Sequence, residues 1–280
     1  MNLILQGSAD RSTIEQLVAV ARPARIEAIH PRAWRCIDVA DTPDVRREVS
    51  AASLEAGLDA AFIKPGLRLS DFRVLAMDMD STVITIECID EIADMQGLKP
   101  QVARITEAAM RGEIEFAESL TRRVALLEGL DAGALQKVYD ERLKLSPGVD
   151  ALIATARGAG LKTLLVSGGF TFFTDRVKAR LGFDYSHANV LEVANGRLTG
   201  KVVGGIVDGE EKKRTVERVC AQLGVPTGSA IVVGDGANDL KMMSLAGLSV
   251  AYRAKPVVRA QADVGLNFSG LDGILAVLEQ

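Results

Sequence analysis

Four continuous apolar runs, each followed at once by a polar or glycine-rich turn, constrain the fold of this chain more than any other feature. They span residues 74–77, 161–166, 230–233 and 248–251. Helical stretches such as 148–157 and 239–246 separate most of them. Strands that are apolar on both sides are typical of a parallel sheet covered by helices on both faces. We therefore expect residues 67–280 to form an α/β core with a Rossmann-like parallel sheet.

The segment from about 91 to 146 interrupts this alternation. It lacks strand-like runs, and its apolar residues recur at helical spacing, as in Leu120, Val124 and Leu127. We expect it to form a helical cap inserted into the core.

Residues 1–66 show a pattern of their own. Strand-like runs at 2–6, 25–29, 33–39 and 59–63 alternate with helical stretches at 12–20 and 43–56. Thr42 and Pro43 are typical of an N-cap and a first helical residue. The order β-α-β-β-α-β resembles the ferredoxin-like α+β fold of ACT modules, and residues 64–66 form a plausible linker. Docking, dimerisation and metabolite binding all remain open as roles for this module.

Composition disfavours several classes of function. The 280 residues are 48% hydrophobic and carry a formal net charge of −4, so no global positive field attracts nucleic acid. No apolar stretch approaches the roughly 20 residues of a membrane span, and the N-terminus does not resemble a signal peptide. The three cysteines are too scattered for a disulfide framework or a zinc cluster. We expect a cytoplasmic protein with a small-molecule partner and neither nucleic acid nor membrane; a homodimer through the N-terminal module is compatible with the sequence.

Two carboxylates follow the first apolar run, in the sequence DMDST at residues 78–82. At a strand end, Asp78 and Asp80 can point into one space, where one carboxylate attacks phosphorus and its neighbour moves a proton. A DxDxT pattern arises by chance in a chain of this length with a probability of roughly a few per cent. The motif therefore needs support from other strand ends.

The second run ends in Ser167-Gly168-Gly169 and the third in GDGAND at residues 234–239. A hydroxyl group and unobstructed N–H groups form a natural phosphate cradle, although a plain strand-to-helix turn has the same sequence. Asp235 and Asp239 offer oxygen ligands that suit Mg2+. An EF-hand calcium loop is disfavoured, because the required glutamate and the flanking helices are missing.

Lys212 lies between these two motifs. A lysine near a phosphate neutralises the transferring group, but Lys212 belongs to the run KKR, where a solvated lysine is the ordinary expectation. Its identification rests on a spacing of 23 residues before Asp235. Lys213 and Arg214 remain the alternatives.

In order, DxDxT, SGG, a lysine and GDGxND are the motifs of the haloacid dehalogenase-like phosphatases, and from about residue 72 to 280 their spacing resembles the phosphoserine phosphatase branch. The resemblance implies that Asp78 is the nucleophile that becomes phosphorylated and that Asp80 is the acid and base. It implies a Mg2+ ion held by the carboxylates of Asp78 and Asp235 and by the backbone carbonyl of Asp80, with Asp239 supporting the site through metal-bound water. The phosphate would be held by Ser167, Gly168 and Lys212.

The same resemblance identifies a substrate side. Glu87, nine residues after Asp78, would meet an amino group, and Arg123 would hold a carboxylate, although the adjacent Arg122 shows that exposed helix arginines are common here. Met110 and Phe116 would form an apolar lid, and Asn238 would also contact the substrate. A glutamate and an arginine together suit a zwitterion, so phosphoserine is favoured over other small phosphomonoesters.

The expected reaction is hydrolysis of O-phospho-L-serine to L-serine and phosphate, the last step of serine biosynthesis, through a phospho-aspartate. Transfer of the phosphate to an alcohol, or hydrolysis of another small phosphomonoester, are the alternatives within enzymes. A regulatory binding protein with a phosphatase-like scaffold is a further alternative. It is disfavoured because all four motifs are intact.

Overall fold

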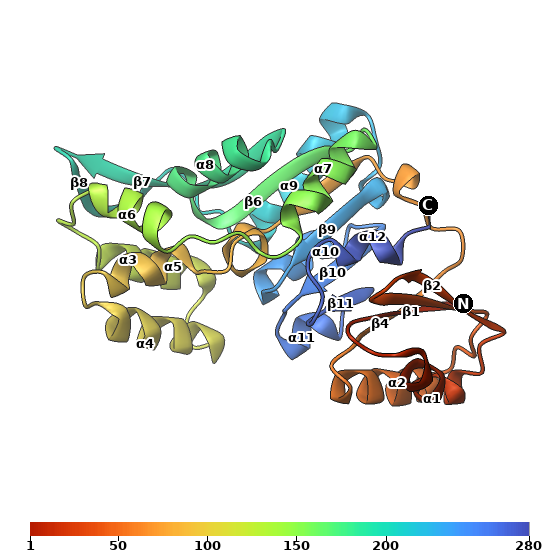
Figure 1. The fold of residues 1–280 in the computed structure, drawn as a ribbon. Coiled ribbons are helices and arrows are strands. Elements are labelled where there is room, and N and C mark those ends of the chain that lie inside the picture. The colour runs from red at the N-terminus through yellow and green to blue at the C-terminus, as the bar shows by residue number, and fades with distance from the viewer. Residues whose placement is uncertain (280) are drawn as a thin grey trace.

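The computed structural model describes residues 1–279, except the side chain of Met110. The chain forms a four-stranded sheet near its N-terminus and a seven-stranded sheet in the remainder (Figure 1). The predicted α/β class, with a separate N-terminal α+β unit, is confirmed. No helix in the described part of the chain is long and apolar enough to cross a membrane.

The large sheet has the strand order β11-β10-β9-β5-β6-β7-β8. Its strands are β5 (Val74–Met77), β6 (Lys162–Phe170), β7 (Tyr185–Ala194), β8 (Arg197–Val203), β9 (Ala230–Gly234), β10 (Leu248–Tyr252) and β11 (Val264–Leu266). Neighbouring strands are parallel except for the hairpin β7–β8. Because β5 lies between β9 and β6, the three strand ends that carry the predicted motifs are neighbours.

Helices cover both faces of this sheet, which explains why its strands are continuously apolar. Leu75 and Met77 pack in one core cluster with residues of α7 (Val149–Gly158), α8 (Thr171–Leu181) and α12 (Gly273–Val277). Val74 and Ala76 pack in a second cluster with residues of α9 (Gly209–Leu223), α10 (Leu240–Met243) and α11 (Pro256–Arg259). Successive residues of β5 thus face opposite helical layers.

Four helices inserted between β5 and β6 form a layer at one end of the sheet, on the left of Figure 1, which we call the helical cap. They are α3 (Cys88–Asp94), α4 (Lys99–Met110), α5 (Phe116–Ala125) and α6 (Gly133–Glu141). Two extended segments join the cap to the core. The N–H of Thr85 donates to the carbonyl of Lys144 at 2.9 Å, and the N–H of Ser146 donates to that of Val83 at 2.9 Å.

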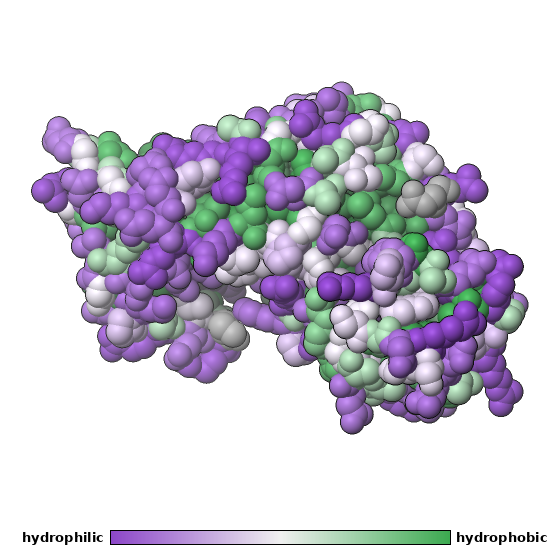
Figure 2. All heavy atoms as spheres, in the orientation of Figure 1, coloured by the Kyte–Doolittle hydropathy of each residue, from purple (hydrophilic) through white to green (hydrophobic). Residues whose placement is uncertain are grey.

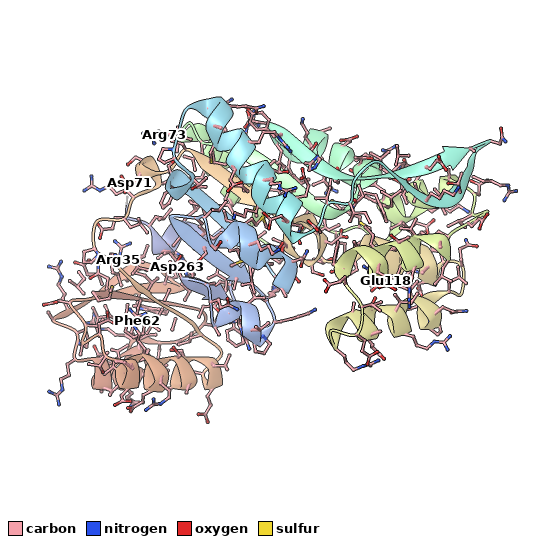
Figure 3. All side chains as sticks on the ribbon, turned by 180° about the vertical axis from the view of Figure 1, so that it is seen from behind. Arg35, Phe62, Asp71, Arg73, Glu118 and Asp263 are labelled. Atoms are coloured by element: carbon pink, nitrogen blue, oxygen red, sulfur yellow. The ribbon has the colours of Figure 1, made fainter. Side chains whose placement is uncertain are left out.

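The N-terminal sheet has the antiparallel order β2-β3-β1-β4. Its elements are β1 (Asn2–Gln6), α1 (Arg11–Leu17), β2 (Arg25–His30), β3 (Ala33–Ile37), α2 (Pro43–Glu55) and β4 (Asp59–Ile63), in the predicted order. Thr42 caps α2, since its side chain accepts the N–H of Val45 at 3.3 Å. Figure 3 shows Arg35 and Phe62 on opposite faces of this sheet, Phe62 on the face covered by α2.

Some elements differ from those expected. The helix predicted at 239–246 is shorter, because a tight turn at Ala237–Asp239 comes first and α10 ends at Met243. The strands β7, β8 and β11 were not predicted from the sequence. The hairpin β7–β8 packs against α5 and so forms part of the support of the cap.

Candidate active site

The carboxyl ends of β5, β6 and β9 open into a cavity of about 750 Å³ between the large sheet and the helical cap. The space-filling view shows a notch between the cap and the N-terminal module (Figure 2). The predicted site residues that line the cavity are Asp78, Asp80, Glu87, Phe116, Arg123, Ser167, Gly168, Asp235 and Asn238. Lys212 and Asp239 lie directly behind it, fully buried. The side chain of Met110, at the end of α4, lies outside the described part of the chain.

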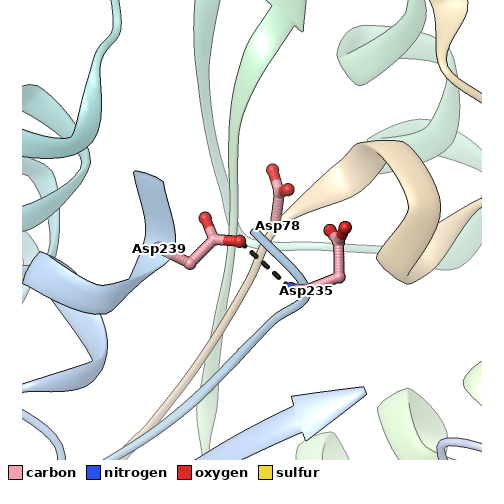
Figure 4. A group of neighbouring side chains, drawn as sticks. All are labelled: Asp78, Asp235 and Asp239. Carbon is pink, nitrogen blue, oxygen red and sulfur yellow. Dashed lines mark hydrogen bonds between the residues drawn. The ribbon is translucent and has the colours of Figure 1, made fainter. Parts of the chain in front are cut away.

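Two aspartates of the cavity wall and a third directly behind it form an acidic cluster. Asp78 follows β5, Asp235 follows β9, and Asp239 stands in the turn before α10, with one carboxylate oxygen of each within 4.8 Å of the others (Figure 4). The turn requires Gly234, because a Cβ there would lie 2.5 Å from the carboxylate of Asp239. The sequence GDGxND thus packs two carboxylates closely around one strand end.

Lys212 on α9 joins two of these aspartates. Its Nζ donates to Oδ1 of Asp78 and to Oδ1 of Asp239, at 2.7 Å each. The other oxygen of Asp239 accepts the N–H groups of Asp235 and Gly236 at 3.1 and 3.0 Å. Both oxygens of Asp239 are therefore engaged with protein donors, whereas Asp78 and Asp235 keep oxygen atoms that face the cavity.

This donor set fits a hard divalent cation. The three carboxylates and the one ammonium group sum to two negative charges when all are ionised. Burial, together with the like charges of its neighbours, raises the pKa of Asp235 to about 7. Burial and the charge of Asp239 likewise raise the pKa of Asp78, against the effect of Lys212. A cation bound between the carboxylates would relieve this repulsion.

Asp80 is placed to act on protons. It is buried, its Oδ1 has no protein partner among the described residues, and its Oδ2 accepts the N–H of Cys88 at 3.4 Å. Burial, with a contribution from Glu87, raises the pKa of Asp80 to about 8. A carboxyl group with such a pKa is mostly protonated at neutral pH, which is the state that a general acid needs.

The rest of the DMDST motif lies in a wide turn, Met79–Val83, whose backbone is not helical at Asp80 and Ser81. Ser81 adopts a left-handed conformation with φ of 57°, uncommon for a residue other than glycine, and its hydroxyl donates to Oε1 of Glu87 at 2.7 Å. The hydroxyl of Thr82 donates to Oδ1 of Asp235 at 3.1 Å. Neither Ser81 nor Thr82 was assigned a role from the sequence, although the threonine belongs to the DxDxT motif.

The motif SGG forms the end of β6. Oγ of Ser167 accepts the N–H of Gly169 at 2.8 Å, so the hydroxyl proton remains free to donate into the cavity. A Cβ at Gly169 would lie 2.9 Å from Oδ2 of Asp80, and a Cβ at Gly168 would lie 2.9 Å from the ring of Phe116. The two glycines therefore allow the side chains of Asp80 and Phe116 to approach the end of β6 closely.

Glu87 and Arg123 face the cavity from the cap side. Glu87 precedes α3 and is open to the cavity, although the surrounding protein raises its pKa. Arg123 on α5 is partly buried, and its Nε–H donates to the carbonyl of Ser119 at 3.4 Å. Burial lowers the pKa of Arg123, against the charges of Asp90, Glu87 and Asp80. The cap side thus presents the carboxylate of Glu87 and the guanidinium of Arg123 to a molecule in the cavity.

Further cap residues that were not predicted also line the cavity, among them Asp90, Thr106 and Ser119. Helical spacing was the only available signal for two of them. Asp90 lies three residues after Glu87 and Ser119 four residues before Arg123, so each shares a helix face with a predicted residue.

Comparison with known proteins agrees with this geometry. A family model described as haloacid dehalogenase-like hydrolase matches residues 75–244. A phosphoserine phosphatase of Polaromonas sp. (strain JS666) is 54% identical over 231 residues, which cover 81% of this chain and 98% of that protein.

Solved structures extend the similarity to the whole chain. A HAD family hydrolase from Salmonella enterica serovar Typhi superposes with a TM-score of 0.91 at 33% identity, over 100% of this chain and 99% of that one. A probable phosphoserine phosphatase from Vibrio cholerae gives a TM-score of 0.84 at 35% identity, over 99% and 86%. The chain therefore belongs to the haloacid dehalogenase-like hydrolase family, and within it groups with the phosphoserine phosphatases.

Proposed function

We propose that this enzyme hydrolyses O-phospho-L-serine to L-serine and phosphate through a phosphorylated Asp78. One observation carries the proposal: a single cavity holds an acidic strand-end cluster around Lys212 on one side and the pair Glu87 and Arg123 on the other. The first suits a phosphate ester, and the second suits the amino and carboxylate groups of an amino acid. A sugar phosphate would need neither of the two cap charges.

In the first step the carboxylate of Asp78 attacks phosphorus, and the bond from phosphorus to the serine oxygen breaks. Asp80 gives its proton to that oxygen, so serine leaves as a neutral alcohol. In the second step the ionised Asp80 takes a proton from water, whose oxygen attacks phosphorus and releases Asp78. The hydroxyl of Ser167, the backbone at Gly168 and the ammonium of Lys212 would hold the phosphate oxygens.

A Mg2+ ion fits the donor set better than a softer metal, because every available ligand is an oxygen atom. The carboxylates of Asp78 and Asp235 and the backbone carbonyl of Asp80 would hold it, and Asp239 would support it by keeping Lys212 and the turn in place. When bound, the ion offsets negative charge on the phosphate as a Lewis acid.

The substrate is tested by a phosphate-release screen with Mg2+ across L-phosphoserine, D-phosphoserine, phosphothreonine and several sugar phosphates. We expect L-phosphoserine to give the highest kcat/KM. Chelation with EDTA should abolish release, and added Mg2+ should restore it. Acceptor alcohols in parallel reactions separate hydrolysis from phosphate transfer, since a transferase would release less inorganic phosphate when they are present. A sugar phosphate as the best substrate would overturn the phosphoserine assignment.

Asp78→Asn tests the covalent step. An amide is not a nucleophile toward phosphorus, so turnover should fall below detection while the fold persists. Burial and Asp239 disfavour the ionised form of Asp78, and Lys212 keeps Asp239 as its partner when Asp78 is replaced. The variant should therefore unfold at the same temperature as the parent or a higher one. Phosphate release measures the loss of turnover, and thermal unfolding measures the stability of the variant. Retained turnover would exclude Asp78 as the nucleophile.

For the other parts of the chain, we propose that residues 1–66 form an ACT-like module and residues 67–280 the phosphatase, with the cap at about 91–146. Three free cysteine thiols support a reducing cytoplasm as the site of action. Within one chain, α1 and α2 cover one face of the N-terminal sheet and the core covers the other. A homodimer through this module would therefore use its helices or the edge strand β2.

A further inference from the structure

Among the described cap residues that line the cavity, three have a buried polar atom without a protein partner. These atoms are Oδ1 of Asp90 on α3, Oγ1 of Thr106 on α4 and Oγ of Ser119 on α5. Ser119 is only 1% exposed. Buried polar groups in proteins are nearly always hydrogen-bonded. Three such groups on three helices around one cavity therefore form a polar surface that water or a bound ligand would complete.

The charged group next to this surface is Arg123. Its Nε–H donates to the carbonyl of Ser119, which ties the guanidinium stem to α5. The N–H groups of both terminal nitrogens have no acceptor among the described residues. Of the carboxylates that act on Arg123, Asp90 acts most strongly, ahead of Glu87 and Asp80. Asp90 thus acts on the guanidinium through its charge, without a direct ion pair among the described residues, and both side chains line the open cavity.

A guanidinium holds a carboxylate best when two of its N–H groups are aimed in parallel. An arginine side chain has many rotamers, so holding its guanidinium in one orientation costs conformational entropy. A second interaction that fixes the guanidinium before the substrate binds would reduce this cost. Asp90 can supply the anchor, because it lies on the cavity face of α3 in the first turn after Glu87, with its N–H donating to the carbonyl of Glu87 at 3.1 Å. Glu87 would thus meet the amino group of the substrate, while Asp90 would orient the guanidinium of Arg123.

We propose that Asp90 is a positioning residue, which orients the guanidinium of Arg123 toward the carboxylate of the bound substrate, with Thr106 and Ser119 completing the polar wall behind it. This inference rests on the proposed hydrolysis of phosphoserine and identifies what sets its selectivity for a carboxylate. Asp90 itself touches neither the phosphate nor the metal site.

The experiment compares L-phosphoserine with phosphoethanolamine, which keeps the ester and the amino group but lacks the carboxylate. Asp90→Asn should raise KM for phosphoserine roughly tenfold and change kcat by less than about twofold. Both parameters for phosphoethanolamine should stay within about twofold of the parent. In the Arg123→Ala background, Asp90→Asn should add no further loss, because the group that it orients is gone.

Asp94→Asn is the matched control, since Asp94 lies one turn later on α3 and pairs with Arg142 and Lys99 at 3.8 and 3.9 Å. Asp94→Asn should leave the ratio of kcat/KM for phosphoserine to kcat/KM for phosphoethanolamine unchanged. Equal losses on both substrates after Asp90→Asn, or losses that add to those of Arg123→Ala, would instead mean that Asp90 contacts the amino group, and the inference would fall. If Asp90→Asn does not fold, the shorter Asp90→Ser must show the same selectivity. A parent enzyme without activity on phosphoserine would overturn the proposed function instead.

Discussion

At the scale of single residues, Lys212 shows how position on a helix selects one cation from a run of three. Its carboxylate partners come from two other strand ends, whereas the side chain of Arg214 is exposed and that of Lys213 is not fully buried. The buried face of α9 carries Val216 and Val219, four and seven residues after Lys212. Helical periodicity thus separates the three candidates that spacing to Asp235 left open. The capping residue Asp208, which accepts the N–H of Glu211 at 2.9 Å, fixes the start of that helix.

Lys212→Met should lower kcat/KM by at least about a hundredfold, because the phosphate and Asp78 lose their buried positive partner. It should also destabilise the fold by about 3 kcal/mol, since breaking a buried ion pair leaves carboxylates without compensation. Lys213→Met is the matched control, one residue along the same helix, and should change neither quantity appreciably. Phosphate release and denaturant unfolding measure the two effects. If Lys213→Met proved the more damaging variant, the phosphate-binding lysine would be misidentified.

At the scale of elements, the strand ends were predictable from the sequence, but their neighbours in the sheet were not. Continuous apolar runs require burial on both faces, which identifies β5, β6, β9 and β10. No local sequence pattern predicts that β9 and β6 flank β5, because strand order depends on how the intervening helices pack. That Asp78, Ser167 and Asp235 lie close together was inferred from the family resemblance. The strand order explains it, because the three residues follow or end neighbouring strands.

The hairpin β7–β8 was missed despite a local signal. Asn195 and Gly196 both have positive φ, 50° and 74°, as a two-residue hairpin turn of this kind requires. The flanking strands are partly exposed and irregular, with a register shift between Leu191 and Val193, so they did not read as buried runs. The polar cap residues were also not predictable, since the role of Asp90 emerges only when three helices pack around one cavity.

Asp184 joins the starts of β6 and β7 and gives a pH prediction. Its carboxylate accepts the N–H and hydroxyl of Thr163 at 2.9 and 3.0 Å and the ammonium of Lys162 at 2.8 Å. Burial acts to raise the pKa of Asp184, but these bonds outweigh burial and lower it below 3.8. Its stabilising contribution is therefore present above about pH 4 and is lost as the pH falls through the lowered value.

Asp184→Asn should reduce the free energy of unfolding by about 1–2 kcal/mol at pH 7. The difference from the parent should stay constant down to about pH 5 and shrink below about pH 4, where the parent loses the same charge. Denaturant unfolding across this range measures it, with Asp175→Asn, an exposed carboxylate on α8, as control. A difference that persisted unchanged at the acid end would show that packing, and not charge, holds the two strands.

At the scale of the whole molecule, the N-terminal module is packed onto the core. Ile4, Ala61 and Ile63, on the sheet face away from α1 and α2, join the core cluster of the large sheet. This explains why β1 is buried along its whole length, although one side of a free module would be solvated. The terminal guanidinium of Arg35 donates to the carbonyl of Leu278 at 2.9 Å on the same face. From the sequence, a run of apolar residues in β1 was visible, but the surface that covers it was not.

Asp59, at the start of β4, makes the most specific contact between the two parts. The residue is only 3% exposed, and its carboxylate accepts the backbone N–H groups of Asn267, Phe268 and Ser269, at 2.6, 3.2 and 2.8 Å. Asp59→Ala would leave these N–H groups without an acceptor, which should cost about 3 kcal/mol. The module should then detach more often and expose the connecting segment.

Limited proteolysis separates this local detachment from global unfolding. Trypsin does not cleave the bond between Lys64 and Pro65, so cleavage after the exposed Arg68 reports on the connecting segment. It should be faster in Asp59→Ala than in the parent. Asp44→Ala is the control, because that carboxylate is 82% exposed and pairs with Arg47 on the surface of the same module. If both variants were cut at the parental rate, the apolar face formed by Ile4, Ala61 and Ile63 would hold the module without help from Asp59.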